Sequence, residues 1–323
     1  MASSQYLKAL IKSFVDGDGD HFVDVAQQMA NHEARLGHTR LADDLRALLG
    51  NSRKNEPRQP LPLMKPRGDL ANLLDVSFPK TLLSSMVLSE EIREKLNRAI
   101  KEHRHIEKIL SHGLSPRRKI LLVGPPGTGK TMTASVLAAE LSLPLFRVRL
   151  DALISKYLGE TASKLRLVFD AIQETRGVYF FDEFDAIASQ RGNANDVGEV
   201  RRSLNSFLQM IEQDDSNSLV IAATNHPEIL DYAVFRRFDD VVIYDVPDKD
   251  EVVLVLQNIL SGYNVSVMSL RELASSAQGL SYADLVHVAE DVIKEAIIFD
   301  EPTVSLESMS RLFEERKGIR KYR

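Results

Sequence analysis

The segment GPPGTGKT at residues 124–131 constrains the fold of this chain more than any other part of the sequence. It satisfies the pattern G-x-x-x-x-G-K-[ST], follows the apolar run KILLVG and opens the helical pattern TMTASVLAAEL. Glycines in such a turn let successive backbone N–H groups face a polyphosphate, beside the positive end of a helix. The segment therefore predicts an α/β fold with a phosphate-binding turn between a buried strand and a helix.

Individual residues of this turn have predicted roles. Lys130 is placed to reach the β- and γ-phosphates of a nucleotide, and the Thr131 hydroxyl is placed to bind Mg²⁺. The residues predicted to contact the nucleotide are Gly124, Pro125, Pro126, Gly127, Thr128, Gly129, Lys130, Thr131, Met132 and, further along the chain, Asp182.

Two adjacent carboxylates follow a later apolar run, where VYFFDEFD places Asp182 and Glu183. Such a pair is costly to bury unless a cation meets it. We expect Asp182 to bind Mg²⁺ together with Thr131, and Glu183 to act as the base that polarises an attacking water. Asn225, which ends AATN after the next run, is expected to position that water or to contact the γ-phosphate. Asp185 could equally be structural.

Strand-like runs alternate with helical patterns before residue 246, which is typical of a mostly parallel sheet covered by helices. The runs are KILLVG, LFRVRL, VYFFD, LVIAATN and DVVIYDV, and the pattern after them is helical only. We predict a short all-α N-terminal adaptor domain at 1–50, a proline-rich basic linker at 51–69, a large α/β P-loop NTPase domain at 70–246 and a small all-α lid domain at 247–323.

Composition excludes several kinds of site. The chain has no cysteine, which excludes disulfides, thiolate zinc sites and cysteine nucleophiles. A net charge of -5 argues against a protein that coats nucleic acid. No run approaches the roughly 18 apolar residues of a membrane span. We therefore expect a cytoplasmic protein without a membrane partner. His103, His105 and His112 are expected to be solvated helix histidines rather than metal ligands.

Four motifs in order, GPPGTGKT, FFDEFD, AATN and LDYAVFRRFD, resemble an AAA+ ATPase of the AAA branch. The resemblance covers roughly residues 70–316 and includes SKYLGET and GLSYADL. The paired arginines resemble the katanin/spastin-like group, and proteasomal and membrane-bound protease ATPase modules are also similar. The resemblance implies ATP and Mg²⁺ as cofactors and a ring, usually a hexamer, with ATP at the subunit boundaries. Arg236 and Arg237 match the arginines that reach a neighbouring subunit's γ-phosphate.

The arginine motif departs from the pattern of many relatives, because Arg236 and Arg237 are adjacent rather than separated. Either arginine could instead pair with a nearby carboxylate such as Asp239 or Asp240. We expect at least one of the two to act in a neighbouring subunit.

The motif GLSYADL also departs, because it has no arginine where other branches place a second nucleotide sensor. We expect Ser281 and Tyr282 to line the nucleotide pocket through backbone contacts instead.

The segment SKYLGET at 155–161 carries an aromatic residue where peptide-threading relatives project one into a central pore. We predict that Lys156, Tyr157 and Leu158 form a substrate-gripping loop, since an aromatic ring contacts an extended backbone whatever its sequence. A ring that anchors a helix start and a ring that stacks on a base are the alternatives. The segment RGNANDVGEVRRSLNSF is the candidate second pore loop.

The function that fits these features is a ring-forming motor, driven by Mg-ATP hydrolysis, that remodels, unfolds or disassembles a protein substrate by threading it through a pore. The alternatives are a nucleic-acid-associated AAA+ ATPase, such as a loader or a transposition or defence regulator, and a nucleotide-switched scaffold that activates a partner effector. The chain has no H-E-x-x-H motif, so a peptidase would be a separate partner. The expected partners are further copies of the chain and a protein substrate.

Overall fold

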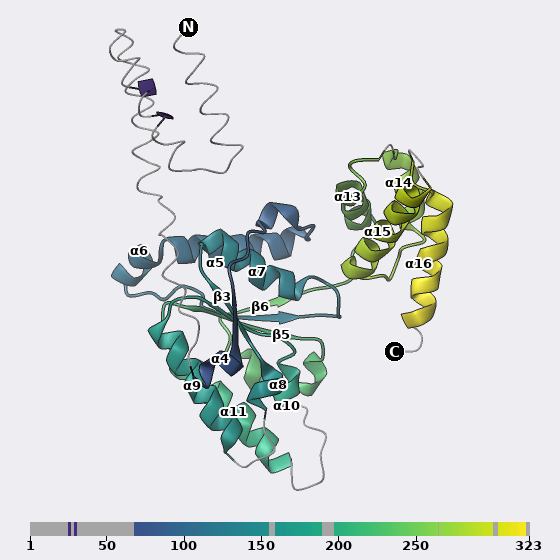
Figure 1. Cartoon of the computed structure of the whole chain (residues 1–323). Coiled ribbons are helices and arrows are strands. Elements are labelled where there is room, and N and C mark those ends of the chain that lie inside the picture. The colour runs from purple at the N-terminus through teal and green to yellow at the C-terminus, as the bar shows by residue number, and fades with distance from the viewer. Residues whose placement is uncertain are drawn as a thin grey trace. The chain divides into compact units, whose positions relative to one another are not determined.

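The computed structural model describes residues 25–26, 29–30, 68–154, 159–188, 197–263, 265–299 and 303–320 (Figure 1). The chain divides into two compact units, Met1–Met64 and Lys65–Arg323. In the first unit, residues 25–26 and 29–30 are helical, and the rest of the predicted N-terminal domain and most of the linker lie outside the described residues. The domain boundaries given above stay predictions.

A six-stranded sheet, in the order β1-β3-β4-β5-β2-β6, forms the centre of the described part of the second unit. β2 pairs in parallel with β5 and β6, and β4 pairs in parallel with β3 and β5, whereas β1 pairs with β3 antiparallel. The predicted α/β class with a mostly parallel sheet is confirmed. The strands are β1 (Leu74–Ser77), β2 (Lys119–Val123), β3 (Leu145–Val148), β4 (Val178–Phe181), β5 (Leu219–Thr224) and β6 (Asp240–Ile243).

The sequence pattern does not predict β1. This strand has four residues, LDVS, of which Leu74 is buried and Val76 is half-buried. Such a short run carries little periodicity of its own. It becomes a strand because its backbone pairs with the edge of β3, with Leu74 opposite Val148.

Helices precede and connect the strands and cover the sheet (Figure 1). The helices are α4 (Leu70–Leu73), α5 (Glu90–Arg104), α6 (Ile106–Ser111), α7 (Lys130–Leu141), α8 (Leu150–Leu153), α9 (Glu160–Glu174), α10 (Asp185–Ala188), α11 (Val197–Gln213) and α12 (Tyr232–Phe235). Short 3₁₀ turns lie at Leu83–Ser85 and Pro227–Ile229.

The sheet buries both of its faces, which is why its central strands read as continuous apolar runs. Every residue of β2, β4 and β5 is buried. Alternate residues enter different core clusters: Phe181 packs with Phe207 of α11, at 5.1 Å between ring centroids, while Phe180 belongs to the cluster that contains Leu137 of α7. Because side chains pack on both faces of the sheet, the ends of these strands are held in place. The candidate site described in the next section lies at these strand ends.

The segment after the sheet is helical, as predicted, and has its own apolar cluster, which includes Leu256 and Phe313. A capping box starts α13, and a second, formed by Ser281 and Asp284, starts α15. Because a capping box satisfies free N–H groups of the first turn, it fixes where a helix begins. The helices are α13 (Lys249–Ile259), α14 (Val267–Ala274), α15 (Tyr282–Ile298) and α16 (Leu306–Arg320).

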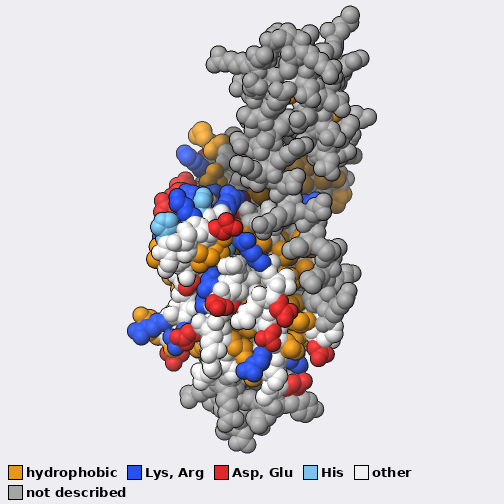
Figure 2. Space-filling view, turned by 90° about the vertical axis from the view of Figure 1, so that its left-hand side faces the viewer, with side chains coloured by type: hydrophobic (Ala, Val, Ile, Leu, Met, Phe, Trp, Pro, Cys, Tyr) orange, Lys and Arg blue, Asp and Glu red, His pale blue; other side chains and the backbone are white. Residues whose placement is uncertain are grey.

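Acidic and basic side chains are interspersed over the described part of the face in Figure 2, a mixture typical of a solvated surface. Within the described ranges, no helix combines the length and the apolar character needed to cross a bilayer.

His103 contradicts the expectation of three solvated histidines. His105 and His112 are exposed, but only 2% of the surface of His103 is accessible. His103 follows Leu96 and Ile100 at helical spacing on the apolar face of α5, and its Nε2 forms a hydrogen bond with the Arg117 carbonyl oxygen at 3.0 Å. The apolar face of the helix therefore draws this ring into the core.

Burial lowers the pKa of the His103 imidazole from 6.5 to about 4. The hydrogen bond to the Arg117 carbonyl opposes this shift, and the positive charges of Arg176 and Arg118 add to it. Because the pKa is lower in the folded than in the unfolded chain, folding is favoured while the ring is neutral. The contribution of His103 to stability is fully present above pH 6.5 and is lost as the pH falls toward about 4.

We predict that His103→Gln, which keeps a donor for the Arg117 carbonyl but does not titrate, flattens the acid side of the stability profile. Wild-type protein should lose about 3 kcal/mol more than this variant between neutral pH and pH 4, as measured by urea unfolding at a series of pH values. His105→Gln, at the exposed position that follows the last residue of α5, is the control. Parallel profiles for wild type and His103→Gln would contradict the prediction.

Candidate functional site

The carboxyl ends of three parallel strands meet at one edge of the sheet and carry the predicted site residues. β2 ends at Val123 and β5 at Thr224, and the register places these two residues opposite each other. β4 lies on the other side of β5 and is followed by Asp182. The phosphate-binding turn, Asp182 and Asn225 are therefore neighbours in space, as expected at the carboxyl edge of a parallel sheet.

The glycines of the turn allow two close approaches of the backbone. Gly124 and Gly127 have φ angles of +153° and +77°. A Cβ atom on Gly124 would lie 2.3 Å from the carbonyl oxygen of Tyr244, and one on Gly127 would lie 2.6 Å from Oγ of Ser281. A side chain at either position would push the turn away from its neighbours, so glycine is required on steric grounds.

Lys130 begins α7 and is nearly buried, with 7% of its surface accessible. Its Nζ donates hydrogen bonds to the carbonyl oxygens of Gly124 at 2.6 Å and Pro125 at 2.7 Å. Burial lowers the pKa of the Lys130 amine, and the carboxylates of Asp182 and Asp185 act in the opposite direction. The turn thus encloses a cation at its centre, where the sequence predicts a phosphate contact.

Thr131 and Asp182 lie in direct contact. The Thr131 Oγ1 hydroxyl donates to Asp182 Oδ2 at 2.9 Å, and the Arg147 Nη2 atom donates to the same oxygen at 2.9 Å. A hydroxyl and a carboxylate are the oxygen ligands that Mg²⁺ prefers, and this pair borders the phosphate-binding turn. The two residues therefore fit the predicted metal site.

Glu183 is exposed and has a φ angle of +52°, a left-handed conformation that residues other than glycine rarely adopt. Its N–H donates to Asp182 Oδ1 at 3.1 Å, and the next N–H, of Phe184, donates to the Ala223 carbonyl oxygen on β5 at 2.8 Å. These bonds hold a backbone conformation that costs on the order of 1–3 kcal/mol. Strain of this kind is frequent at functional sites.

Asn225 and Asp185 differ in their surroundings. Asn225 is half-buried and borders the cavity described below. Asp185 is buried and accepts a hydrogen bond from Thr224 Oγ1 at 2.9 Å, and that hydroxyl accepts one from the N–H of His226 at 3.0 Å. Asp185 thus fixes the end of β5 and the position of Asn225, which favours the structural alternative for this carboxylate.

A cavity of 430 Å³ brings the predicted residues together, and its size is that of a small-molecule site. The helices after the sheet, α13 to α16, are called the lid below. Its helix α15 borders one side of the cavity, where the Ala283 N–H donates to the Gly127 carbonyl oxygen at 3.1 Å. From the α/β part, the lining residues are Pro126, Gly127, Gly129, Lys130, Thr131, Met132, Asp182, Glu183 and Asn225; from α15 they are Tyr282, Ala283 and Val286. Of the residues predicted to contact the nucleotide, Gly124, Pro125 and Thr128 are outside the lining. Thr128 Oγ1 donates to the Pro125 carbonyl oxygen at 2.8 Å within the turn.

Tyr282 and Ser281, which the sequence predicts to line the nucleotide pocket, have different positions at the cavity. Tyr282 lines the cavity with its side chain next to Glu251, and burial raises the pKa of its phenol. Ser281 is buried and forms the cap of α15 with Asp284, so it supports the cavity rather than lining it. The expectation of backbone contacts from both residues stays a prediction.

Comparison with known proteins identifies the family. Residues 120–246 match the model of the ATPase family associated with various cellular activities (AAA). Over 92% of its length, the chain is 37% identical to an uncharacterized AAA family ATPase, y4kL, of Sinorhizobium fredii, and it covers 90% of that protein. The chain belongs to the AAA family of ATPases. Nucleotide binding and ATP hydrolysis follow from this membership, and the predicted resemblance is confirmed at the level of the family.

Other relatives of this AAA ATPase are longer proteins. The chain is 33% identical to the ATP-dependent zinc metalloprotease FtsH of Helicobacter felis, over 69% of the chain and 37% of that protein. It is 36% identical to the proteasome-activating nucleotidase of Methanococcus maripaludis, over 62% of the chain and 50% of that protein. The chain thus spans half or less of these two relatives. The narrower likeness to the katanin/spastin-like group stays a prediction.

The two adjacent arginines of this AAA ATPase have different intrachain contacts, and neither lines the cavity. Arg237 Nε lies 3.1 Å from Glu212 Oε2 on α11. The guanidinium carbon of Arg236 lies 4.7 Å from the centroid of the exposed Tyr232 ring. Asp239, one of the carboxylates considered from sequence, accepts hydrogen bonds from the backbone N–H groups of residues 118 and 119 instead.

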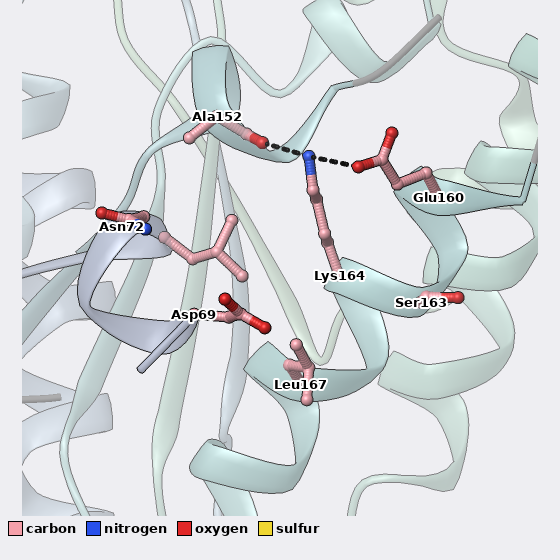
Figure 3. Close-up of a pocket in the computed structure, with 8 residues that line it drawn as sticks. Asp69, Asn72, Ala152, Glu160, Ser163, Lys164 and Leu167 are labelled. Atoms are coloured by element: carbon pink, nitrogen blue, oxygen red, sulfur yellow. Dashed lines mark hydrogen bonds and ion pairs between the residues drawn. The ribbon is translucent and has the colours of Figure 1, made fainter. Parts of the chain in front are cut away.

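A second cavity, of 360 Å³, lies between α4, α8 and α9 (Figure 3), and it shares no lining residue with the first cavity. On its rim, Lys164 Nζ donates to the Ala152 carbonyl oxygen at 2.9 Å and lies 3.4 Å from Glu160 Oε1. The predicted gripping residues at 156–158 and residues 191–196 of the candidate second pore loop lie outside the described residues. The rest of that candidate loop, residues 197–207, is not a loop but part of α11. Lys164 joins the two helices that flank residues 155–158.

Sequence reasoning missed Arg147. The visible signal is a charged residue within the apolar run LFRVRL, at the exposed position of β3. An arginine in such a strand is usually a solvated side chain, and only the alignment of β3 with β4 shows that it meets Asp182.

We predict that Gly127→Ala weakens ATP binding by about tenfold or more, because a left-handed alanine is strained and its methyl group would displace the lid from the turn. Isothermal titration with a non-hydrolysable ATP analogue measures the effect. Gly262→Ala is the matched control, since a Cβ at Gly262 meets no atom within 4 Å. Equal affinities for the two variants would contradict the steric role of Gly127.

Proposed function

We propose that this AAA ATPase is a Mg²⁺-dependent, ring-forming motor that remodels a protein substrate by threading it through a pore. The observation that carries the ATPase part is the convergence of Lys130, Thr131, Asp182, Glu183 and Asn225 on one cavity. A hydrolytic site needs a cation for the phosphates, oxygen ligands for a metal and a base near the attacking water. These five side chains supply that set.

Each residue has a proposed role in hydrolysis. Lys130 binds the β- and γ-phosphates, and Thr131 and Asp182 hold Mg²⁺. Bound Mg²⁺ would neutralise charge on the phosphate oxygens. The exposed carboxylate of Glu183 accepts a proton from the attacking water, which Asn225 orients from the neighbouring strand end. The hydrogen bonds around Asp182 and Asp185 keep these groups in place before the nucleotide binds.

We propose that Arg236 and Arg237 complete the site of a neighbouring subunit, which makes a ring, most simply a hexamer, the active form. An arginine supplied across an interface can accelerate phosphoryl transfer by roughly 10³–10⁵-fold. To act in this way, Arg237 would have to leave its contact with Glu212 and bind a phosphate of the neighbouring subunit's nucleotide instead. Their contact is an exposed pair, with 39% and 58% of the side-chain surfaces accessible, and such pairs contribute little stability. The exchange is therefore inexpensive.

We predict that Glu183→Gln binds ATP and assembles but loses hydrolysis by roughly 10²–10⁴-fold, because the base is removed. The double variant Arg236→Ala/Arg237→Ala should also be inactive. Mixing the two should restore part of the ATPase rate, because arginines from Glu183→Gln subunits then reach sites that keep Glu183. Phosphate release measures the rate. A mixture as inactive as its components would contradict arginine action between subunits.

The proposal of a protein substrate rests on two supports. The names of two relatives connect their ATPases with a zinc metalloprotease and with the proteasome, both of which act on proteins. The segment that contains Lys156, Tyr157 and Leu158 resembles the gripping loop of peptide-threading proteins of this family. We further propose that the N-terminal segment selects the substrate, that a separate effector such as a peptidase can act with the ring, and that the protein works in the cytoplasm.

We predict that Tyr157→Ala retains ATP hydrolysis but loses substrate handling, because the apolar grip is removed, whereas Tyr157→Phe retains both. The Glu183→Gln background, held in ATP, captures the bound macromolecule, and mass spectrometry and sequencing identify protein and nucleic acid in parallel. Loss of bound nucleic acid with unchanged protein capture would favour the nucleic-acid alternative. Unchanged capture of both would overturn the gripping role of Tyr157 and favour a nucleotide-switched scaffold.

A further inference from the structure

Arg147 contacts the proposed metal ligand from the neighbouring strand. It lies on β3 opposite Phe180 of β4, and its guanidinium carbon is 5.9 Å from the centroid of that ring. Its Nη2 atom lies 2.9 Å from Asp182 Oδ2, the same oxygen that accepts the hydrogen bond of Thr131. The other carboxylate oxygen accepts the Glu183 N–H. The guanidinium of Arg147 therefore contacts the same Asp182 oxygen as the Thr131 hydroxyl does.

The charge of this contact is permanent, because an arginine side chain stays protonated throughout the pH range of proteins. The charge of Lys130 also acts on Asp182, but the hydrogen bonds of Lys130 Nζ go to two backbone carbonyl oxygens of the turn. Among the ion pairs of the described residues, Asp182 is paired with Arg147. The proposed magnesium ligand thus already has a cationic partner within the chain.

A guanidinium and a metal ion compete when they need the same carboxylate oxygen. Each is attracted to the negative charge, and the two repel each other, so binding of one weakens binding of the other. Near the protein surface, a unit charge a few ångströms from a divalent cation changes its affinity by about tenfold or more. The accessible surface of Arg147, 48% of the side chain, leaves the guanidinium free to move aside when the metal binds.

We propose that Arg147 is a resident counter-cation of Asp182, which holds this carboxylate in position and sets the Mg²⁺ concentration at which the nucleotide site is loaded. This inference rests on the proposed function, in which Asp182 is a metal ligand. Arg147 acts through Asp182 and is a positioning residue. An ordinary surface ion pair, which contributes little to stability, would have no effect on metal dependence.

The test uses the full chain and a fluorescent non-hydrolysable ATP analogue, with its affinity measured in Mg²⁺ and in EDTA. The affinity in Mg²⁺ divided by the affinity in EDTA reports the contribution of the metal to nucleotide binding. Arg147→Gln should raise this ratio by about tenfold, because the competing charge is gone. Arg147→Lys, which keeps a positive charge, should stay close to wild type. An unchanged or lower ratio for Arg147→Gln overturns the proposal.

Two controls make the outcome specific. Arg149→Gln removes an exposed arginine two residues along, which pairs with Asp151 at 3.3 Å, and should leave the ratio unchanged. Asp182→Asn should bring the ratio close to one. If it does not, the metal assignment within the proposed function fails. If it does while Arg147→Gln leaves the ratio unchanged, the metal assignment stands and the counter-cation role fails. Thermal unfolding checks that all variants fold.

Discussion

Parallel pairing of β2 with β5, and of β5 with β4, is the constraint on which the rest of the structure depends. It places three strand ends side by side although they lie far apart in the sequence, and each end carries polar groups that would be costly to bury alone. The pairing is possible because apolar side chains cover both faces of these strands. The polar edge is thus supported by an apolar sheet, and small displacements of the strands would separate the site residues.

Much of this arrangement is predictable from sequence, because local rules determine it. The phosphate-binding turn, Asp182, Glu183 and Asn225 each follow an apolar run, and the ends of parallel strands meet at one edge of a sheet. Three other features could not be predicted from local rules: the burial of His103, the contact of Arg147 with Asp182 and the pairing of Arg237 with Glu212. These features depend on which elements pack together and on side-chain directions that no single run of residues determines.

The start of α15 contacts the phosphate-binding turn directly. The Ala283 N–H donates to the Gly127 carbonyl oxygen, and the side chains of Ser281 and Ala283 lie within 3.1 Å of where a Cβ on that glycine would be. The distance between α15 and the turn is therefore set by this hydrogen bond and by these two small side chains. A change in the conformation of the turn, such as a bound phosphate could cause, would be transmitted to the start of α15. This short connection gives a physical route from the nucleotide to the lid without a sensor arginine.

The left-handed backbone at Glu183 shows a conflict between chemistry and local preference. Asparagine or glycine would adopt this conformation more readily, yet neither has a carboxylate that could take a proton. Under the role proposed for Glu183, this position keeps a carboxylate at the cost of backbone strain. Glycine at this position would relieve the strain and would remove the proposed base.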